Sequence, residues 1–265
     1  MSINLYNKDQ FIKIKAAAEC AHSILLTLIE ACKPGVTTQE LEDLADLEII
    51  KHKAEPLFQG YHGYPFCTCL SVNEFIVHGF PNSTPLKAGD VISIDIGIRL
   101  NGFCGDNART IIVGGVESEH SHLIEVTKQA FEAGLAVALP GNTVGHIGNR
   151  INNIVSKPYL DPANRSLGKK FKVFHKVFGH GIGHELHEAP NIPNLGFEGA
   201  GAVLKPGMCI CIEPVVLYNS SEGIIKDSDL YHSVKEFYTS DLKPSAHHEN
   251  QIFITESGPI VLSKV

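Results

Sequence analysis

The stretch LKAGDVISIDIGI, residues 86–98, and the later stretch LKPGMCICIEPVV, residues 204–216, open with the same Leu-Lys-x-Gly and continue as an apolar strand. Each strand carries one acid at the same place, Asp95 in the first copy and Glu213 in the second. A carboxylate on a half-buried strand is costly unless something pairs with it. An apolar strand that occurs twice, each time with an acid at the same place, indicates an internal duplication and a functional reason for the acids.

The segments around the two strands also recur in the same order. Residues 8–33 and 121–139 both have helix-forming residues with an apolar stripe at helical spacing. Each stops at a Pro-Gly-x-Thr and is followed by a second predicted helix, over 38–53 in the first half and roughly 144–156 in the second. Thr37 and Glu40 have the spacing of a capping box. A His-x-x-Pro then follows in each half, beginning at His78 and His187.

This order predicts a tandem duplication that folds as one unit with pseudo-twofold symmetry. The expected fold class is α+β, with one largely antiparallel sheet and the helices packed on one face. We expect a single domain over residues 1–265, whose two halves span about 1–115 and 116–265. The polar, linker-like stretch 219–248 occurs in the second half only and is expected to form a long hairpin loop.

The composition is that of a globular chain of 265 residues, with 43% hydrophobic and 19% charged residues. A net charge of −7 without a Lys/Arg-rich run argues against DNA as a partner. No apolar stretch approaches the roughly 20 residues that span a bilayer. The start, MSINLYNKDQFIKIK, lacks the apolar core of a signal peptide. The expected compartment is therefore the cytoplasm, with no membrane partner.

Seven cysteines in a chain of this kind do not predict a disulfide framework. Cys67 and Cys69, and likewise Cys209 and Cys211, form Cys-x-Cys pairs that could be soft metal ligands. Each pair lies in an apolar, strand-like run, where cysteine is commonly a small buried hydrophobe. For Cys209 and Cys211 we favour the buried interpretation.

The acids of the first half are predicted to share a face of a hairpin. Asn101-Gly102 is a strong signal for a two-residue turn, which places residue 95 opposite 108 and residue 97 opposite 106. Asp106 then lies diagonally from Asp95, at roughly 7–8 Å along the backbone. Two buried carboxylates that converge repel each other unless a proton or a cation lies between them. A divalent ion suits this arrangement, although a solvated hairpin face would also tolerate it.

The second half adds ligands to the same predicted site. Glu213 repeats Asp95, and the strand expected to pair with it carries Glu249. The stretch GHGIGHELHEAP contributes three histidines, His180, His184 and His187. Glycine on both sides of His180 permits close backbone approach and unusual φ/ψ angles. Three histidines beside four acids favour a metal site over core packing.

These residues belong to motifs that together resemble the type I methionine aminopeptidases, subfamily A of peptidase family M24, which have the pita-bread fold. The resemblance spans roughly residues 8–262. It is carried by YHGYP (61–65), SVNEFIVHGFP (71–81), DIGIRLNGFCGD (95–106), GHGIGHELHEAPNIPN (179–194), IEP (212–214) and HEN-x-I (248–252).

The resemblance implies a metal-dependent hydrolase that removes the N-terminal methionine of nascent proteins when the second residue is small. It implies two divalent ions, of cobalt, manganese, iron, zinc or nickel, with the ligands Asp95, Asp106, His180, Glu213 and Glu249. By the same resemblance, Glu213 also acts as a general base, and His78 and His187 are catalytic and contact the substrate. The implied pocket for the methionine side chain consists of Phe58, Tyr61, Tyr64, Cys69 and Leu186. The expected partners are peptide N-termini and, transiently, the ribosome, and the enzyme is expected to be a monomer.

The chain departs from the usual pattern of that family near the substrate. Leu186 stands where an aromatic residue is frequent, Ala189 where Glu is frequent, and His247 where Gln is usual. The family often has a Trp after the position of Glu213, whereas this chain has none, and Phe237 or Tyr238 could replace it. Two alternatives stay open at this point: a proline-specific peptidase of the same fold, and a non-catalytic binding protein built on it.

Overall fold

The computed structural model describes residues 2–115, 120–160, 166–231 and 234–263. Its four α-helices in this part of the chain are α1 (Lys8–Ala31), α2 (Thr38–Lys51), α3 (Ser121–Ala136) and α4 (Val144–Val155). Short 3₁₀ turns occupy Tyr61–Gly63 and Val113–Gly115. The strands of the first half are β1 (Glu55–Pro56), β2 (Thr68–Val72), β3 (Val91–Leu100) and β4 (Phe103–Ile112). The later strands are β5 (Pro158–Leu160), β6 (Ser166–Lys169), β7 (Phe171–Val173), β8 (Gly179–Gly181), β9 (Glu188–Ile192), β10 (Cys209–Ile212), β11 (Val215–Tyr218), β12 (Gly223–Asp227), β13 (Lys235–Thr239), β14 (Ser245–Thr255) and β15 (Gly258–Val261).

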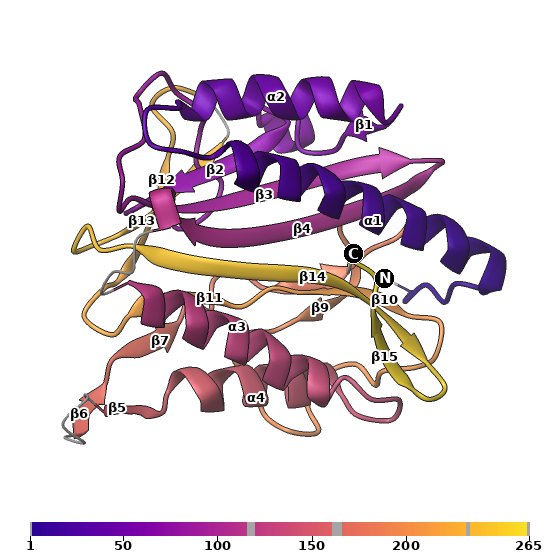
Figure 1. Ribbon diagram of the computed structural model, residues 1–265. Coiled ribbons are helices and arrows are strands. Elements are labelled where there is room, and N and C mark those ends of the chain that lie inside the picture. Colours follow the sequence, from indigo (N-terminus) through magenta and orange to yellow (C-terminus); the bar gives the residue numbers. More distant parts are fainter. Residues whose placement is uncertain (1, 116–119, 161–165, 232–233, 264–265) are drawn as a thin grey trace.

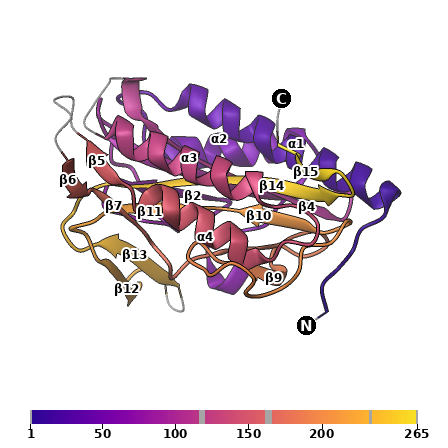
Figure 2. The same ribbon diagram turned by 90° about the horizontal axis from the view of Figure 1, so that it is seen from below.

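One antiparallel sheet of eleven described strands runs through the molecule in the order β1-β3-β4-β14-β10-β8-β9. β2 pairs with β3, β11 and β15 pair with β14, and β7 extends the sheet from β11. The first half of the chain thus meets the second where β4 pairs with β14 (Figure 1). Figure 2 shows α1, α2 and α3 on one side of this sheet and the β12–β13 hairpin on the other. The expected α+β layering, with helices on one face, is confirmed.

α1 packs unusually close to β4 because both elements have small residues at the contact. Its buried face includes Ala17, Ala18 and Ala21. A Cβ atom added at Gly105 of β4 would lie 2.2 Å from the carbonyl oxygen of Ala17. Any side chain at residue 105 would therefore push the helix off the strand that carries Asp106.

The two halves repeat the same local hydrogen bonds, which supports the predicted duplication. The Gly35 N–H donates to the Leu86 carbonyl at 2.8 Å, and the Gly141 N–H donates to the Leu204 carbonyl at 2.9 Å. Both glycines have positive φ, +93° and +90°. The buried apolar residues also form two large clusters, one under α1 and α2 and one under α3 and α4. The predicted boundary of the halves near residue 116 lies outside the described residues.

Local expectations from the sequence agree with the structure at the helix ends and at the first hairpin. Thr37 and Glu40 form the predicted capping box of α2. Asn101 and Gly102 both have positive φ, +53° and +79°, as a type I′ turn requires. Asp95 consequently pairs with Ala108, and Gly97 with Asp106, in the predicted register.

The sequence predicts a linker-like loop over 219–248, and that prediction is wrong for half of its described residues, which lie in strands. β12 and β13 pair as a second hairpin within it, and β14 already begins at Ser245. The Ile76 N–H donates to the Phe237 carbonyl at 2.8 Å, so the hairpin is anchored to the first half. Cross-strand pairing and this contact give the polar segment an ordered structure. No helix in the described part of the chain combines the length and apolar character needed to cross a membrane.

Candidate metal centre and active site

Four carboxylates reach one face of the sheet from neighbouring strands. Asp95 on β3 and Glu249 on β14 both pair with Ala108, which lies between them on β4. Asp106 is two residues before Ala108 and therefore points to the same face. Ile212 at the end of β10 pairs with Asn250, so Glu213 follows at the level of Glu249. The small side chain of Ala108 leaves room for the acids around it.

His180 reaches this group because its strand, β8, is held between β10 and β9. A Cβ atom at Gly179 would lie 2.2 Å from the Cys211 carbonyl oxygen, and one at Gly181 would lie 2.4 Å from that of Ala189. The expected close backbone approach is therefore confirmed. The unusual φ/ψ angles are not found, because neither glycine has a positive φ.

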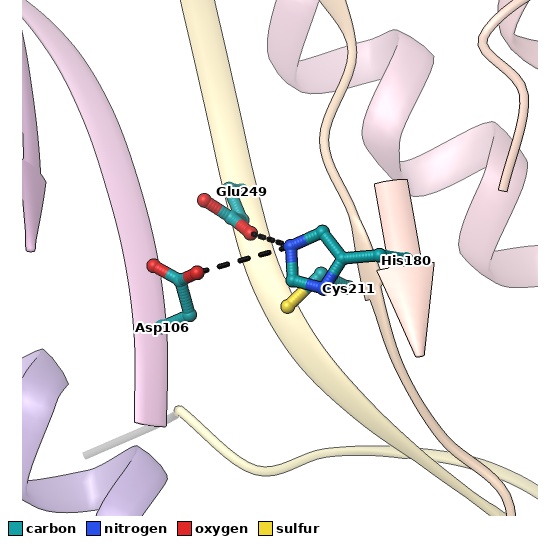
Figure 3. A group of neighbouring side chains, drawn as sticks. All are labelled: Asp106, His180, Cys211 and Glu249. Atoms are coloured by element: carbon teal, nitrogen blue, oxygen red, sulfur yellow. Dashed lines mark ion pairs between the residues drawn. The ribbon is translucent and has the colours of Figure 1, made fainter. Parts of the chain in front are cut away.

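The imidazole of His180 faces the acids through Nε2 (Figure 3). Its Nδ1 lies 2.9 Å from the Gly181 carbonyl oxygen, which fixes the proton on Nδ1 and leaves the Nε2 lone pair free. Nε2 is 3.8 Å from Asp106 Oδ2, 3.5 Å from Glu213 Oε1 and 4.0 Å from Glu249 Oε1. A backbone carbonyl that orients a histidine in this way is typical of metal sites.

The carboxylates are poorly satisfied without a cation. Asp95 Oδ1, Asp106 Oδ1 and Glu249 Oε1 are buried and have no hydrogen-bond partner. Burial is the largest cause, and repulsion among the acids the second, that raises the pKa of Asp95, Asp106 and Glu249 well above their ordinary values. Burial also raises the pKa of Glu213, to about 8. Ionised carboxylates at this place need positive charge, so the donor set fits divalent ions.

The cation-free protein is expected to lose stability as the pH rises from about 5 to 8. A folded-state pKa of about 8 for Glu213 exceeds about 4.3 for an unfolded glutamate, so its protonation stabilises the fold at low pH. That stabilisation is lost as the pH rises through 8, by about 1.4 kcal/mol per pH unit in the window between the two values. Thermal unfolding of chelated protein measures this slope. Glu213→Gln should reduce it, and an equal slope in that variant would contradict the assignment.

A cavity of about 420 Å³ brings together every predicted site residue. Its acidic end holds the predicted ligands Asp95, Asp106, His180, Glu213 and Glu249. The predicted substrate residues line the rest of it, namely Phe58, Tyr61, Tyr64, Cys69, His78, Leu186 and His187. The apolar and acidic parts of the cavity are adjacent because Cys69 on β2 pairs directly with Asp95 on β3.

The two histidines of the His-x-x-Pro motifs line the same cavity as the acids. His78 has a positive φ of +56°, an uncommon backbone conformation outside glycine, and its ring meets that of Phe237 edge-on at 5.1 Å. The His187 ring lies 4.3 Å from the His180 ring, and its Nδ1 is 2.7 Å from the Tyr61 hydroxyl. Tyr61 therefore fixes the orientation of His187.

His184 does not belong to the site, although the sequence pattern includes it among the candidates. Its Nδ1 lies 3.1 Å from the Gly102 carbonyl oxygen, and its ring packs on Phe103 at 4.3 Å. Of the three clustered histidines, only His180 and His187 line the cavity.

The structure adds lining residues that the sequence does not identify: His62, Val234 and Lys235. Val234 and Lys235 come from the β12–β13 region, for which the sequence predicts a loop. Of the two aromatic candidates for the position of the missing Trp, Phe237 lines the cavity, whereas Tyr238 packs on Phe75 at 4.6 Å.

All seven cysteines are free and buried, in agreement with the sequence. Cys211 is also part of the acidic centre, because ligand atoms of Asp106, His180, Cys211 and Glu249 lie within 4.8 Å of one another. Burial, together with Glu249 and Asp106, raises the pKa of the Cys211 thiol well above its ordinary value. Cys211 is therefore both buried, as the sequence predicts, and close enough to the acids to be a soft metal ligand.

Comparison with known proteins assigns the family. Residues 12–256 match the model of metallopeptidase family M24. A methionine aminopeptidase of Clostridium perfringens is 38% identical over 263 residues, which cover 99% of both chains. The chain belongs to the methionine aminopeptidases of metallopeptidase family M24. Another family member, methionine aminopeptidase 1 of Bacillus subtilis, is 41% identical over 88% of both chains.

Solved structures of the family agree. The crystal structure of methionine aminopeptidase from Rickettsia prowazekii matches with a TM-score of 0.90 and 33% identity, over 99% of this chain and 100% of that one. The prolidase of Pyrococcus horikoshii matches with a TM-score of 0.73 over 98% of this chain but only 63% of its own, at 22% identity. That likeness shows the shared pita-bread fold alone. The assignment as a metal-dependent aminopeptidase is therefore favoured over a proline-specific peptidase or a non-catalytic binding protein.

Proposed function

We propose that this chain removes the N-terminal methionine of peptides at a centre of two divalent ions, held by Asp95, Asp106, His180, Glu213 and Glu249. The meeting of four carboxylates, of which those of Asp106 and Glu249 are buried, with one oriented imidazole at the end of an apolar-walled cavity carries this proposal. When bound, the ions would lower the pKa of a water molecule so that it can attack the peptide carbonyl near neutral pH. Cobalt, manganese, iron, zinc and nickel all accept such a donor set.

The chain's own residues would position the substrate and move its protons. Glu213 is partly buried beside the cavity, so its carboxylate can take a proton from the attacking water and later return it. His78 would hydrogen-bond the amide nitrogen of the bond to be cut. His187, fixed by Tyr61, would stabilise the carbonyl oxygen as negative charge develops on it.

The apolar end of the cavity would select methionine. Tyr64, Cys69 and Val234 form a buried apolar cluster against which Phe58 packs. An unbranched, flexible thioether fits such a surface, whereas a charged side chain would be desolvated there without a partner. Leu186, where related enzymes often have an aromatic residue, leaves space for slow removal of leucine or norleucine.

Peptides that share one tail but differ in the first two residues test the proposed substrate. We expect rapid loss of methionine from Met-Ala, Met-Gly and Met-Ser peptides and slow loss from Met-Lys and Met-Phe, because the second residue lies in the crowded space near His78 and His187. N-terminal sequencing or mass spectrometry measures the products. Preferred cleavage of an X-Pro bond, as in Ala-Pro-Ala, over Met-Ala-Ser would contradict the proposal.

The cellular setting stays a prediction. We propose that the enzyme acts in the cytoplasm as a monomer, on nascent chains and in transient association with the ribosome. The proposal of a single domain composed of two pseudo-symmetric halves is supported by the repeated hydrogen bonds at Gly35 and Gly141.

A further inference from the structure

His247 is a buried imidazole at the metal centre that the five proposed ligands do not include. It lies on β14 two residues before Glu249, so both side chains point to the same face of the sheet. Its side chain is 3% exposed, and its Nε2 has no hydrogen-bond partner. The neighbouring His248 points to the opposite face, where its ring packs on Phe131 at 4.8 Å. A buried nitrogen without a partner is costly and needs an explanation.

The position of His247 relative to Glu213 and Glu249 repeats that of His180. His247 Nε2 lies 3.5 Å from Glu213 Oε2 and 4.0 Å from Glu249 Oε2. His180 Nε2 lies 3.5 Å and 4.0 Å from the other oxygens, Oε1, of the same two residues. The two imidazoles thus face the same pair of carboxylates through different oxygen atoms.

These separations suit shared coordination better than direct hydrogen bonds. A hydrogen bond between an imidazole and a carboxylate has a length of about 2.7–2.9 Å. Two donors that bind one ion at about 2.1 Å lie about 3–4.2 Å apart, depending on the angle between them. Both of the His247 distances fall within the second range, as do those of His180.

We infer that His247 is a further protein ligand of the metal centre and supplies it with a second imidazole nitrogen. This inference rests on the metal site proposed above and adds one ligand to it. A second imidazole makes the centre richer in nitrogen than five ligands with a single histidine. Imidazole suits zinc, iron and nickel, whereas carboxylate-only sites suit magnesium and manganese. Cobalt lies between iron and nickel in the general order of metal affinity, and manganese lies below all three. The centre is therefore expected to prefer zinc, cobalt or nickel over manganese more strongly than a centre with Gln at residue 247 would.

Proton NMR of the cobalt-loaded protein tests the inference without any substrate. The N–H proton of an imidazole bound to high-spin Co²⁺ resonates far outside the ordinary proton range and disappears in D₂O. The wild-type protein with two equivalents of Co²⁺ should show two such signals, one from His180 and one from His247. His247→Gln should show one, and His248→Gln, the matched control on the opposite face, should keep both.

Calorimetric titration with Co²⁺ and Mn²⁺ gives a second readout. His247→Gln should weaken Co²⁺ binding by about 10-fold or more, with a smaller effect on Mn²⁺, as expected for the loss of one imidazole ligand. His248→Gln should leave both affinities unchanged.

One shifted signal in the wild-type protein, or unchanged affinities and two signals in His247→Gln, would overturn the role of His247. Absence of both shifted signals and of Co²⁺ binding in the wild-type protein would instead overturn the metal site itself. The number of shifted N–H signals in the wild-type protein tests the role of His247 whether or not a variant folds.

Discussion

Glu249→Gln is expected to abolish metal binding and, with it, peptide hydrolysis. Glu249 is 2% exposed and lies on β14 between β4 and β10, where it would supply one of the charged ligands of the proposed metal site. Asp106→Asn should have the same effect for the same reason. Chelation of the wild-type protein should likewise reduce activity to background, and a divalent transition metal should restore it, because the attacking water depends on the ions. Metal content by mass spectrometry and hydrolysis of Met-Ala-Ser measure both effects.

The cation-free Glu249→Gln protein should be at least as stable as the cation-free wild type. Burial and then repulsion from Asp106, Glu213 and Asp95 raise the pKa of Glu249, so replacement of its carboxylate relieves the crowding of acids at the site. A loss of activity in this variant would therefore not result from unfolding. Glu185→Gln is the control, since that carboxylate is 74% exposed and lies outside the cavity. Full turnover by wild-type protein whose metal content is verified near zero would contradict the metallopeptidase mechanism.

His78→Ala and His187→Ala are each expected to retain the metal ions but to lose about 10²–10³-fold in kcat. Each would remove one donor to the transition state, and this range is typical for such a loss. Neither ring is needed to hold the ions, because His180 already faces Asp106, Glu213 and Glu249. Steady-state kinetics on Met-Ala-Ser, together with metal analysis of the same samples, measures the effect.

His184→Ala is the control for the histidine variants. It lies three residues before His187, but its ring packs on Phe103 outside the cavity. Its kcat should stay close to that of the wild type. If His78→Ala or His187→Ala stayed folded but lost its metal, the division between ligands and catalytic histidines would be wrong.

Elements that depend on local patterns and on repetition follow from the sequence alone. The Asn101-Gly102 turn sets the register of β3 and β4, because a two-residue type I′ turn leaves no freedom in the pairing. The duplicated strand then leads from Asp95 and Asp106 to Glu213 and Glu249, so the acids of the site can be found without knowledge of any tertiary contact. The start of α2 directly after its N-cap Thr37 follows from capping chemistry within four residues of sequence.

The choice among similar residues depends on tertiary packing instead. His180, His184 and His187 are alike in sequence, and only the packing of β8 between β9 and β10 directs His180 to the acids, while Phe103 holds His184 away. The positions of Phe237 and His247 depend on contacts between segments that are far apart in the chain. Phe237 is held through a hydrogen bond to Ile76, and His247 lies beside Glu213. Local sequence patterns report which residues share a face of one element. They do not report which faces meet, because that depends on the packing of the whole sheet.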